Sequence, residues 1–131
     1  MSTSAQWAFL PLGYALTVLI EMPILLLLLS RHHSMRSRIF AGFWLNACSY
    51  PIVILVLPCI FSPTDSRTLY LWVAEVFAPV SECLLFRLAF QPKGGATPEN
   101  PGVTTRDYAV IILANLASFG IGEWLNRNGW L

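Results

Sequence analysis

The chain has 131 residues, of which 56% are hydrophobic and only 11% are charged, and its formal net charge is +1. Soluble domains usually carry about 25% charged residues, so this composition excludes a typical soluble domain. A net charge so close to zero also argues against nucleic acid as a partner.

Four apolar stretches are long enough to cross a bilayer, which takes about 20 mostly apolar residues. They cover residues 7–29, 39–61, 69–90 and 107–125. We therefore expect an all-α integral membrane bundle of four transmembrane helices, forming a single domain over residues 1–131. The first stretch lacks the basic start and the cleavage site of a signal peptide, so we expect it to be retained.

Positive charges are concentrated in two of the loops, which predicts the orientation. The first and third loops contain Arg31, Arg36, Arg38, Lys93 and Arg106. The second loop and the C-terminal tail contain one arginine each, Arg67 and Arg127. Because loops rich in Lys and Arg stay in the cytoplasm, we expect both termini on the non-cytoplasmic side of a bacterial inner or thylakoid-type membrane.

The third loop, "QPKGGATPENPGVTTR", is rich in Gly, Pro and Thr and reads as a flexible surface segment. Thr104 or Thr105 can cap the fourth helix, and Asp107 complements the positive end of its dipole. Prolines lie inside three spans, where we expect kinks rather than breaks. These prolines are Pro23, Pro51, Pro58 and Pro79.

Each span carries one strongly polar residue at a similar depth. They are Glu21, Asn46, Glu82 and Asn115. Each lies about seven or eight residues from the cytoplasmic end of its span, or roughly 10–12 Å at ~1.5 Å per residue. Ser49 and Ser118 follow three residues after the two asparagines and so share their helix faces.

This order of residues predicts a repeat. A helix with a glutamate is followed by a helix with an N-x-x-S pattern, and the pair then occurs again. Two spans in each half give both halves the same orientation, so the implied pseudo-two-fold axis runs along the membrane normal. The match covers only a few residues in each half, so chance similarity stays open at this stage.

Both glutamates should turn inward, because a charged residue at bilayer depth costs about 2.5–3.5 kcal/mol. We expect them to meet the asparagine amides in one polar layer, with Thr17 on the face of Glu21. Gly42 and Gly122 lie on the faces of the asparagines and are expected to allow close helix approach.

Two further acids, Glu75 and Glu123, lie nearer the outer ends of their helices. Together with Glu82 they can form an acidic ladder that leads inward. The alternative is contact with interfacial water, which the position of Glu123 favours and that of Glu75 leaves open.

Other reactive residue types form no recognised site. His32 and His33 are expected to be solvated residues of the basic loop, and Cys48, Cys59 and Cys83 to fill small apolar positions. No catalytic or metal-binding motif is present, so we expect no enzyme activity, no cofactor and no metal.

The segments "IEMP", "NACSYP" and "AEVFAPVSE" resemble, in this order, small four-span bacterial membrane proteins of cyanobacterial type. Their shared pattern is E-x-P, N-x-x-S-x-P and A-E-x-F. The resemblance implies that Glu21, Asn46 and Glu82 belong to one site, and it carries no named activity.

Two functions remain. The first, which the sequence favours, is a non-enzymatic accessory, assembly or structural component of a larger membrane complex. The second is a small transporter or channel that uses the Glu/Asn layer for a cation or a proton. The expected partners are the lipid bilayer and other membrane proteins, or further copies of the chain in a homo-oligomer.

Overall fold

The structure, a computed structural model, describes residues 3–62 and 64–129. Within these ranges the chain forms helices joined by loops and contains no strand. The helices are α1 (Thr3–Leu28), α2 (Met35–Pro51), the π-helix η1 (Ile52–Val56), α3 (Leu57–Ile60), α4 (Arg67–Phe90) and α5 (Thr105–Arg127). Because α2, η1 and α3 follow one another without a break, four helical segments are long and apolar enough to cross a membrane. The expected all-α membrane bundle is confirmed.

The expected spans lie inside these segments apart from their last residues at 29 and 61. The second segment begins earlier than expected because Ser34 caps it, and its Oγ accepts a hydrogen bond from the Ser37 N–H. At the start of α5 the cap is Thr104, as one of the two expected alternatives. Thr104 and Asp107 form a reciprocal capping box there.

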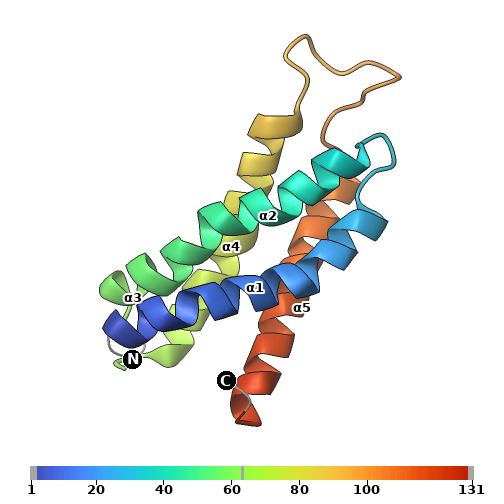
Figure 1. Ribbon diagram of the computed structural model, residues 1–131. Helices are drawn as coiled ribbons and strands as arrows, with labels where there is room; N and C mark the ends of the chain where they lie inside the picture. The colour runs from blue at the N-terminus through green and yellow to red at the C-terminus, as the bar shows by residue number, and fades with distance from the viewer. Residues whose placement is uncertain (1–2, 63, 130–131) are drawn as a thin grey trace.

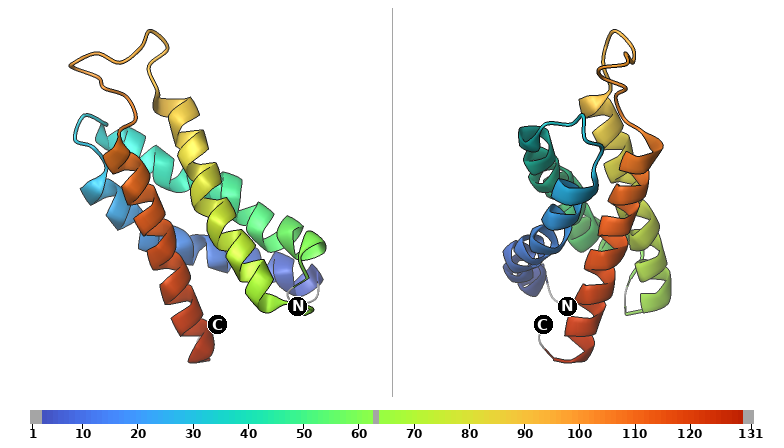
Figure 2. Two further views of the ribbon diagram at one scale, coloured as in Figure 1. Left: turned by 180° about the vertical axis from the view of Figure 1, so that it is seen from behind. Right: turned by 90° about the vertical axis from the view of Figure 1, so that its right-hand side faces the viewer.

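The four segments pack as two crossed hairpins. α1 packs against α2, and α4 packs against α5. α1 also contacts α5, and α2 contacts α4, which gives a ring in the order α1–α2–α4–α5. Figure 1 shows the α1–α2 hairpin lying obliquely across α4 and α5, and Figure 2 shows the same crossing from two other sides. We call the end with loops 29–34 and 91–104 the long-loop end, and the opposite end, where residues 3 and 129 lie, the terminal end.

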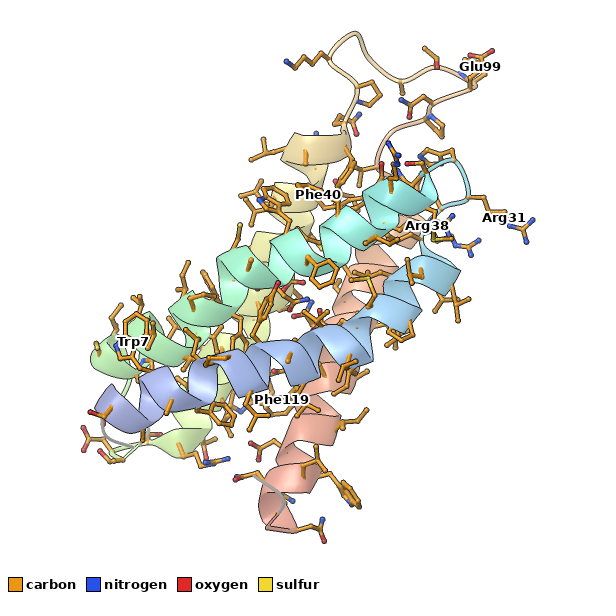
Figure 3. All side chains as sticks on the ribbon, in the orientation of Figure 1. Trp7, Arg31, Arg38, Phe40, Glu99 and Phe119 are labelled. Carbon is orange, nitrogen blue, oxygen red and sulfur yellow. The ribbon has the colours of Figure 1, made fainter. Side chains whose placement is uncertain are left out.

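The hydrophobic core lies toward the long-loop end. It contains Leu25, Leu29, Ala41, Leu45, Phe86, Val110, Ile111 and Ala114. Many other large apolar side chains extend outward from the helices, as Figure 3 shows. Leu19, Leu27, Trp72 and Leu88 are among the most exposed of them. Such an apolar exterior suits a lipid environment.

Prolines lie inside the helices without breaking them, as expected. Pro11 and Pro23 lie inside α1 and Pro79 inside α4, and both helices continue through them. The second segment instead changes its hydrogen-bond register, because η1 lies between Pro51 and Pro58. A short π-helix of this kind inserts an extra residue into the helical turn.

A tyrosine from α4 satisfies the carbonyl that this change leaves free. In η1 the N–H of Leu57 bonds to the carbonyl of Ile52, five residues back. The next carbonyl, that of Val53, therefore meets Pro58, which has no N–H to donate. The hydroxyl of Tyr70 donates to the Val53 carbonyl at 2.8 Å. This hydrogen bond also joins α4 to η1, the middle part of the second membrane segment.

Two glycines allow close helix approach, and one of them was not anticipated. A Cβ at Gly42 would lie 2.5 Å from the sulfur of Met22, so this glycine lets α1 and α2 approach closely, as expected. A Cβ at Gly122 would meet nothing within 4 Å, so the same expectation is wrong there. Gly13 has the tightest surroundings, since a Cβ there would overlap the hydroxyl of Tyr50.

Candidate functional site

Glu21 accepts hydrogen bonds from two other helices. Asn46 of α2 donates from Nδ2 to Glu21 Oε2 at 3.0 Å. Ser118 of α5 lies 2.6 Å from Glu21 Oε1 through its hydroxyl. The Glu21 side chain is 1% exposed, so these contacts lie in the interior of the bundle.

Glu82 is held in the corresponding way. Asn115 of α5 donates from Nδ2 to Glu82 Oε2 at 2.8 Å. Ser49 of α2 donates from its hydroxyl to Glu82 Oε1 at 2.6 Å. Glu82 is 2% exposed. The structure thus brings all six residues of the expected polar layer together.

The two glutamate sites are related by the pseudo-two-fold repeat. Each glutamate accepts one hydrogen bond from an amide of its own hairpin and one from a hydroxyl of the other hairpin. The second hydrogen of each amide also has the same kind of partner, a backbone carbonyl four residues earlier in its helix. The hydrogen bonds of the layer therefore follow the repeat that the sequence order predicted.

No basic side chain balances the two carboxyl groups. Among the described residues the ion pairs are His33–Asp107 and Arg67–Glu123, and neither includes Glu21 or Glu82. Two carboxylates buried without a cation would carry a large desolvation penalty. Each must therefore take up a proton or share a bound cation.

The hydroxyl of Ser118 lies between two acceptors. Its Oγ is 2.6 Å from Glu21 Oε1 and 3.0 Å from the Asn115 carbonyl oxygen. One hydroxyl hydrogen cannot serve both oxygens well. The shorter contact, to Glu21 Oε1, therefore takes the hydroxyl hydrogen, and Ser118 donates to the carboxyl group.

The amide oxygens of the layer accept no hydrogen bond from the part of the chain that the structure describes. Both hydrogens of Asn46 Nδ2 are used, one by Glu21 and one by the carbonyl of Gly42, so its Oδ1 must point the other way. The same holds for Asn115. No described residue donates to either Oδ1, although both side chains are buried and both line a cavity.

This cavity has a volume of about 400 Å³ and extends from the polar layer to the terminal end. The layer forms its floor. Its far end reaches the exposed side chains of Arg67 and Asn126. Thr17 lines the cavity beside Glu21, on the face that the sequence predicted for it. A space of this size and depth can admit a small molecule or ion to the carboxyl groups.

The cavity wall extends the repeat beyond the polar layer. An aromatic residue lies twelve positions before each glutamate, Phe9 in α1 and Tyr70 in α4. Another lies four positions after each asparagine, Tyr50 in α2 and Phe119 in α5. All four line the cavity, so it straddles the pseudo-two-fold axis. These aromatics were not predicted, although the repeat itself contained the signal.

The two secondary acids have different surroundings. Glu75 is half-buried and lines the cavity, and it makes no hydrogen bond to another described residue. Glu123 also lines the cavity, but it accepts a 2.7 Å ion-pair contact from Arg67. Glu123 therefore has an ion-pair partner in addition to nearby water. Its position in the sequence did not indicate this partner. The acidic residues do form a series along the cavity.

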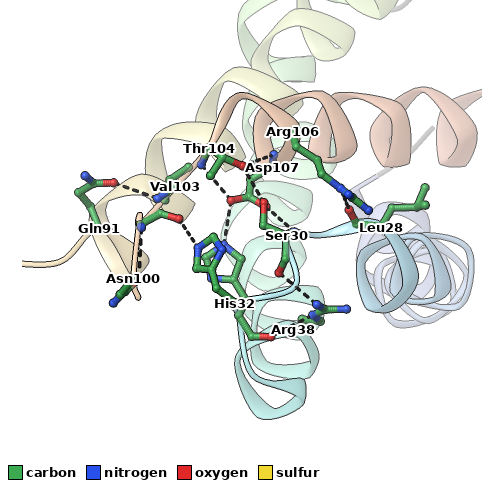
Figure 4. A network of polar contacts seen from close by, with 12 residues as sticks. Leu28, Ser30, His32, Arg38, Gln91, Asn100, Val103, Thr104, Arg106 and Asp107 are labelled. Carbon is green, nitrogen blue, oxygen red and sulfur yellow. Dashed lines mark hydrogen bonds and ion pairs between the residues drawn. The ribbon is translucent and has the colours of Figure 1, made fainter. Parts of the chain in front are cut away.

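A second polar cluster closes the long-loop end (Figure 4). Asp107, which is 0% exposed, accepts hydrogen bonds from the Ser30 N–H at 2.8 Å and the Thr104 N–H at 3.0 Å. Its Oδ2 also pairs with His33 Nε2 at 2.8 Å. We call these four residues the Asp107 clasp. It joins the end of α1 to the start of α5.

The expectation that both histidines are solvated is wrong. His33 is buried, and its ring meets that of Phe86 edge-on at 5.3 Å. His32 donates from Nε2 to the Gly102 carbonyl at 2.6 Å. The ligand atoms of His32, His33 and Asp107 lie within 4.8 Å of one another, a spacing that can hold a metal ion. His32 Nε2, His33 Nε2 and Asp107 Oδ2 already have protein partners, so the geometry fits a clasp.

Arg38 was counted among the charges of the first loop, but it lies inside α2. It is buried and donates to the carbonyl oxygens of Leu26, Ser30 and His33. The last carbonyls of a helix have no partner within it, so a guanidinium group there is stabilising. Arg106 adds a hydrogen bond to the Leu28 carbonyl.

The three cysteines are free, with Cys59 exposed and Cys48 and Cys83 half-buried. Comparisons with protein families, with curated proteins and with solved structures find no match to this chain. Function is therefore inferred from the geometry of the bundle.

Proposed function

We propose that the protein is a small, non-enzymatic membrane transporter or channel that binds a cation or proton at the Glu21–Glu82 layer. One observation carries the proposal. A cavity of about 400 Å³ leads from the terminal end to two buried carboxyl groups that no basic residue of the described ranges neutralises. Ionisable residues at such depth commonly serve ion or proton pathways.

The sequence alone favoured an accessory role, in which the layer only holds helices together. Interhelical hydrogen bonds in membranes contribute about 0.6 kcal/mol on average. Helix association by such bonds requires neither acidic groups nor open space beside them. The cavity is therefore what favours transport, and the accessory role becomes the alternative outcome of the test.

We further propose that the chain works as a homo-oligomer in the lipid bilayer, since four spans alone rarely enclose a pore. The proposed membrane is a bacterial inner or thylakoid-type membrane, with both termini on the non-cytoplasmic side. The cavity then opens to the non-cytoplasmic side and the Asp107 clasp faces the cytoplasm.

Cysteine labelling tests this orientation in a background without Cys48, Cys59 and Cys83. Ser34 and Asp65 are exposed in loops at opposite ends. A membrane-impermeant maleimide added from outside should label Asp65→Cys and leave Ser34→Cys unlabelled until the membrane is opened. The reverse pattern would reject the proposed orientation.

Reconstituted vesicles test the function. Wild-type protein should carry at least one cation from a panel of protons, sodium, potassium and a primary alkylammonium. Glu21→Gln and Glu82→Gln keep the shape of the side chain but remove the ionisable group, so flux should fall at least tenfold while the protein stays folded. Glu99→Gln, in the exposed loop, is the matched control and should keep wild-type flux.

Two results would contradict the proposal. One is wild-type vesicles without flux of any cation in the panel. The other is Gln variants that keep full flux. If, in addition, the wild-type protein co-purifies in fixed ratio with a large membrane complex, the accessory role is the better description.

A further inference from the structure

The cavity above the polar layer has the chemistry of a site for an organic ammonium ion. We infer that its ligand is a primary ammonium with an apolar body, which lies on the pseudo-two-fold axis with its nitrogen at the Glu21–Glu82 floor. This inference rests on the proposed function, because it names the class of cation that the same site takes.

The floor of the cavity presents hydrogen-bond acceptors, and no basic side chain of the described residues pairs with them. The two carboxyl groups accept hydrogen bonds from neutral groups only. The buried Asn46 and Asn115 side chains line the cavity, and no described residue donates to their Oδ1 atoms. A primary ammonium brings three N–H donors and one positive charge. It therefore complements both the missing charge and the unused acceptors.

The wall is suited to an apolar body. Apart from the acids, it consists largely of aliphatic and aromatic side chains, such as Leu16, Ile20, Val53 and Leu71. A metal ion with one shell of waters, at about 30 Å³ per water, would occupy only part of the 400 Å³, and the rest would hold water against apolar side chains. An arylalkyl ammonium uses this space and buries apolar surface against the wall.

Four aromatic rings lie in the wall, one from each long helix segment. Tyr50 and Phe119 follow the floor asparagines by about one helical turn, and Phe9 and Tyr70 lie farther toward the terminal end. Aromatic faces attract cations, and rings grouped around a site are a known way to recognise substituted ammonium ions. The two ring pairs give such a cation successive contacts on its way to the floor.

Calorimetry on the full chain in lipid nanodiscs tests the inference, with 2-phenylethylammonium as the probe and potassium as the inorganic comparison. The wild-type protein should bind the probe at least tenfold more tightly than potassium. Phenylethyltrimethylammonium should bind more weakly than the probe, because it has no N–H to donate.

Two glycines of α5 provide a matched pair of variants. Gly122 lines the cavity and Gly120 does not, and a Cβ at either would meet nothing within 4 Å. Gly122→Phe should fill the cavity and lower affinity for the probe at least tenfold. Gly120→Phe should change it less than twofold. Equal affinities in the two variants would overturn the inference.

The remaining outcomes separate this inference from the proposed function. Binding of an inorganic cation that depends on Glu82, without binding of the probe, would refute the ammonium ligand and leave the proposed function standing. Probe binding that is unchanged in both Glu21→Gln and Glu82→Gln would refute the assigned place of the nitrogen. Probe binding without flux of any cation would support the site but contradict transport.

Discussion

The two ends of the bundle are built differently. At the long-loop end, eight buried apolar residues form the core and the Asp107 clasp fastens α1 to α5. At the terminal end, the helices enclose a cavity of about 400 Å³ instead of a core. The polar layer lies at the border between them. A bundle fastened at one end can keep its helices together while the other end stays open to a ligand.

The largest expected effect comes from breaking the closed end. Asp107→Ala removes the acceptor of two backbone N–H groups and of His33, and should lower the free energy of unfolding by about 3 kcal/mol. Thermal unfolding of the purified protein in detergent measures the effect. Asp65→Ala, at an exposed position of the other end, is the control. Equal stability of the two variants would remove the clasp as a stabilising feature.

The next effect concerns the border between the two ends. Glu82→Leu leaves the Ser49 hydroxyl and one Asn115 N–H without an acceptor, so it should cost about 2 kcal/mol of stability. Glu82→Gln keeps an acceptor and should cost less than half as much. The same unfolding assay compares the two variants. A Leu variant as stable as wild type would show that these hydrogen bonds do not hold the bundle together.

A smaller effect is expected in the wall of the cavity. Gly13→Ala would push the hydroxyl of Tyr50 aside, and the strain should exceed the better helix propensity of Ala by about 1 kcal/mol. Gly122→Ala, in the part of the wall that α5 forms, meets open space and should be neutral or slightly stabilising. Adding Tyr50→Phe should restore the stability of Gly13→Ala. Failure of this rescue would mean that the Tyr50 hydroxyl is not the source of the strain.

The smallest effect belongs to the mouth of the cavity. The Arg67–Glu123 ion pair joins α4 to α5 there, but Arg67 is half exposed. Arg67→Gln should therefore change the unfolding free energy by about 0.5 kcal/mol or less. The effect of Arg67→Gln on the rate of ligand entry should be larger at low salt. Stopped-flow measurement of the binding rate at two ionic strengths would detect this difference. A destabilisation as large as that of Asp107→Ala would contradict the difference between the two ends.

The sequence predicted the spans and the polar layer because both depend on local spacing. Twenty apolar residues define a span wherever they occur, and the shared depth of Glu21, Asn46, Glu82 and Asn115 follows from counting along each helix. The repeat predicted that two hairpins would meet, and the four hydrogen bonds to the glutamates agree with it.

The sequence did not predict the clasp or the cavity because both depend on distant residues. His33 and Asp107 are 74 positions apart, so nothing near either residue indicates its partner. The π-helix was missed for a similar reason. Its free Val53 carbonyl is tolerated only because Tyr70 lies beside it in the folded bundle. For Gly122 the error was the opposite one. A close helix contact was predicted from its small size, but this glycine borders open space.

The exchange of donors between hairpins has a consequence for biogenesis. The ribosome delivers α1 and α2 to the membrane before α4 and α5 exist. During that interval Glu21 has Asn46 but lacks Ser118, and Ser49 has no glutamate to bind. The nascent first hairpin is thus an incomplete intermediate with a carboxyl group only half satisfied in the bilayer. A chain that stalls before residue 105 should keep this defect, so the first hairpin alone should be less stable in the membrane than the complete bundle.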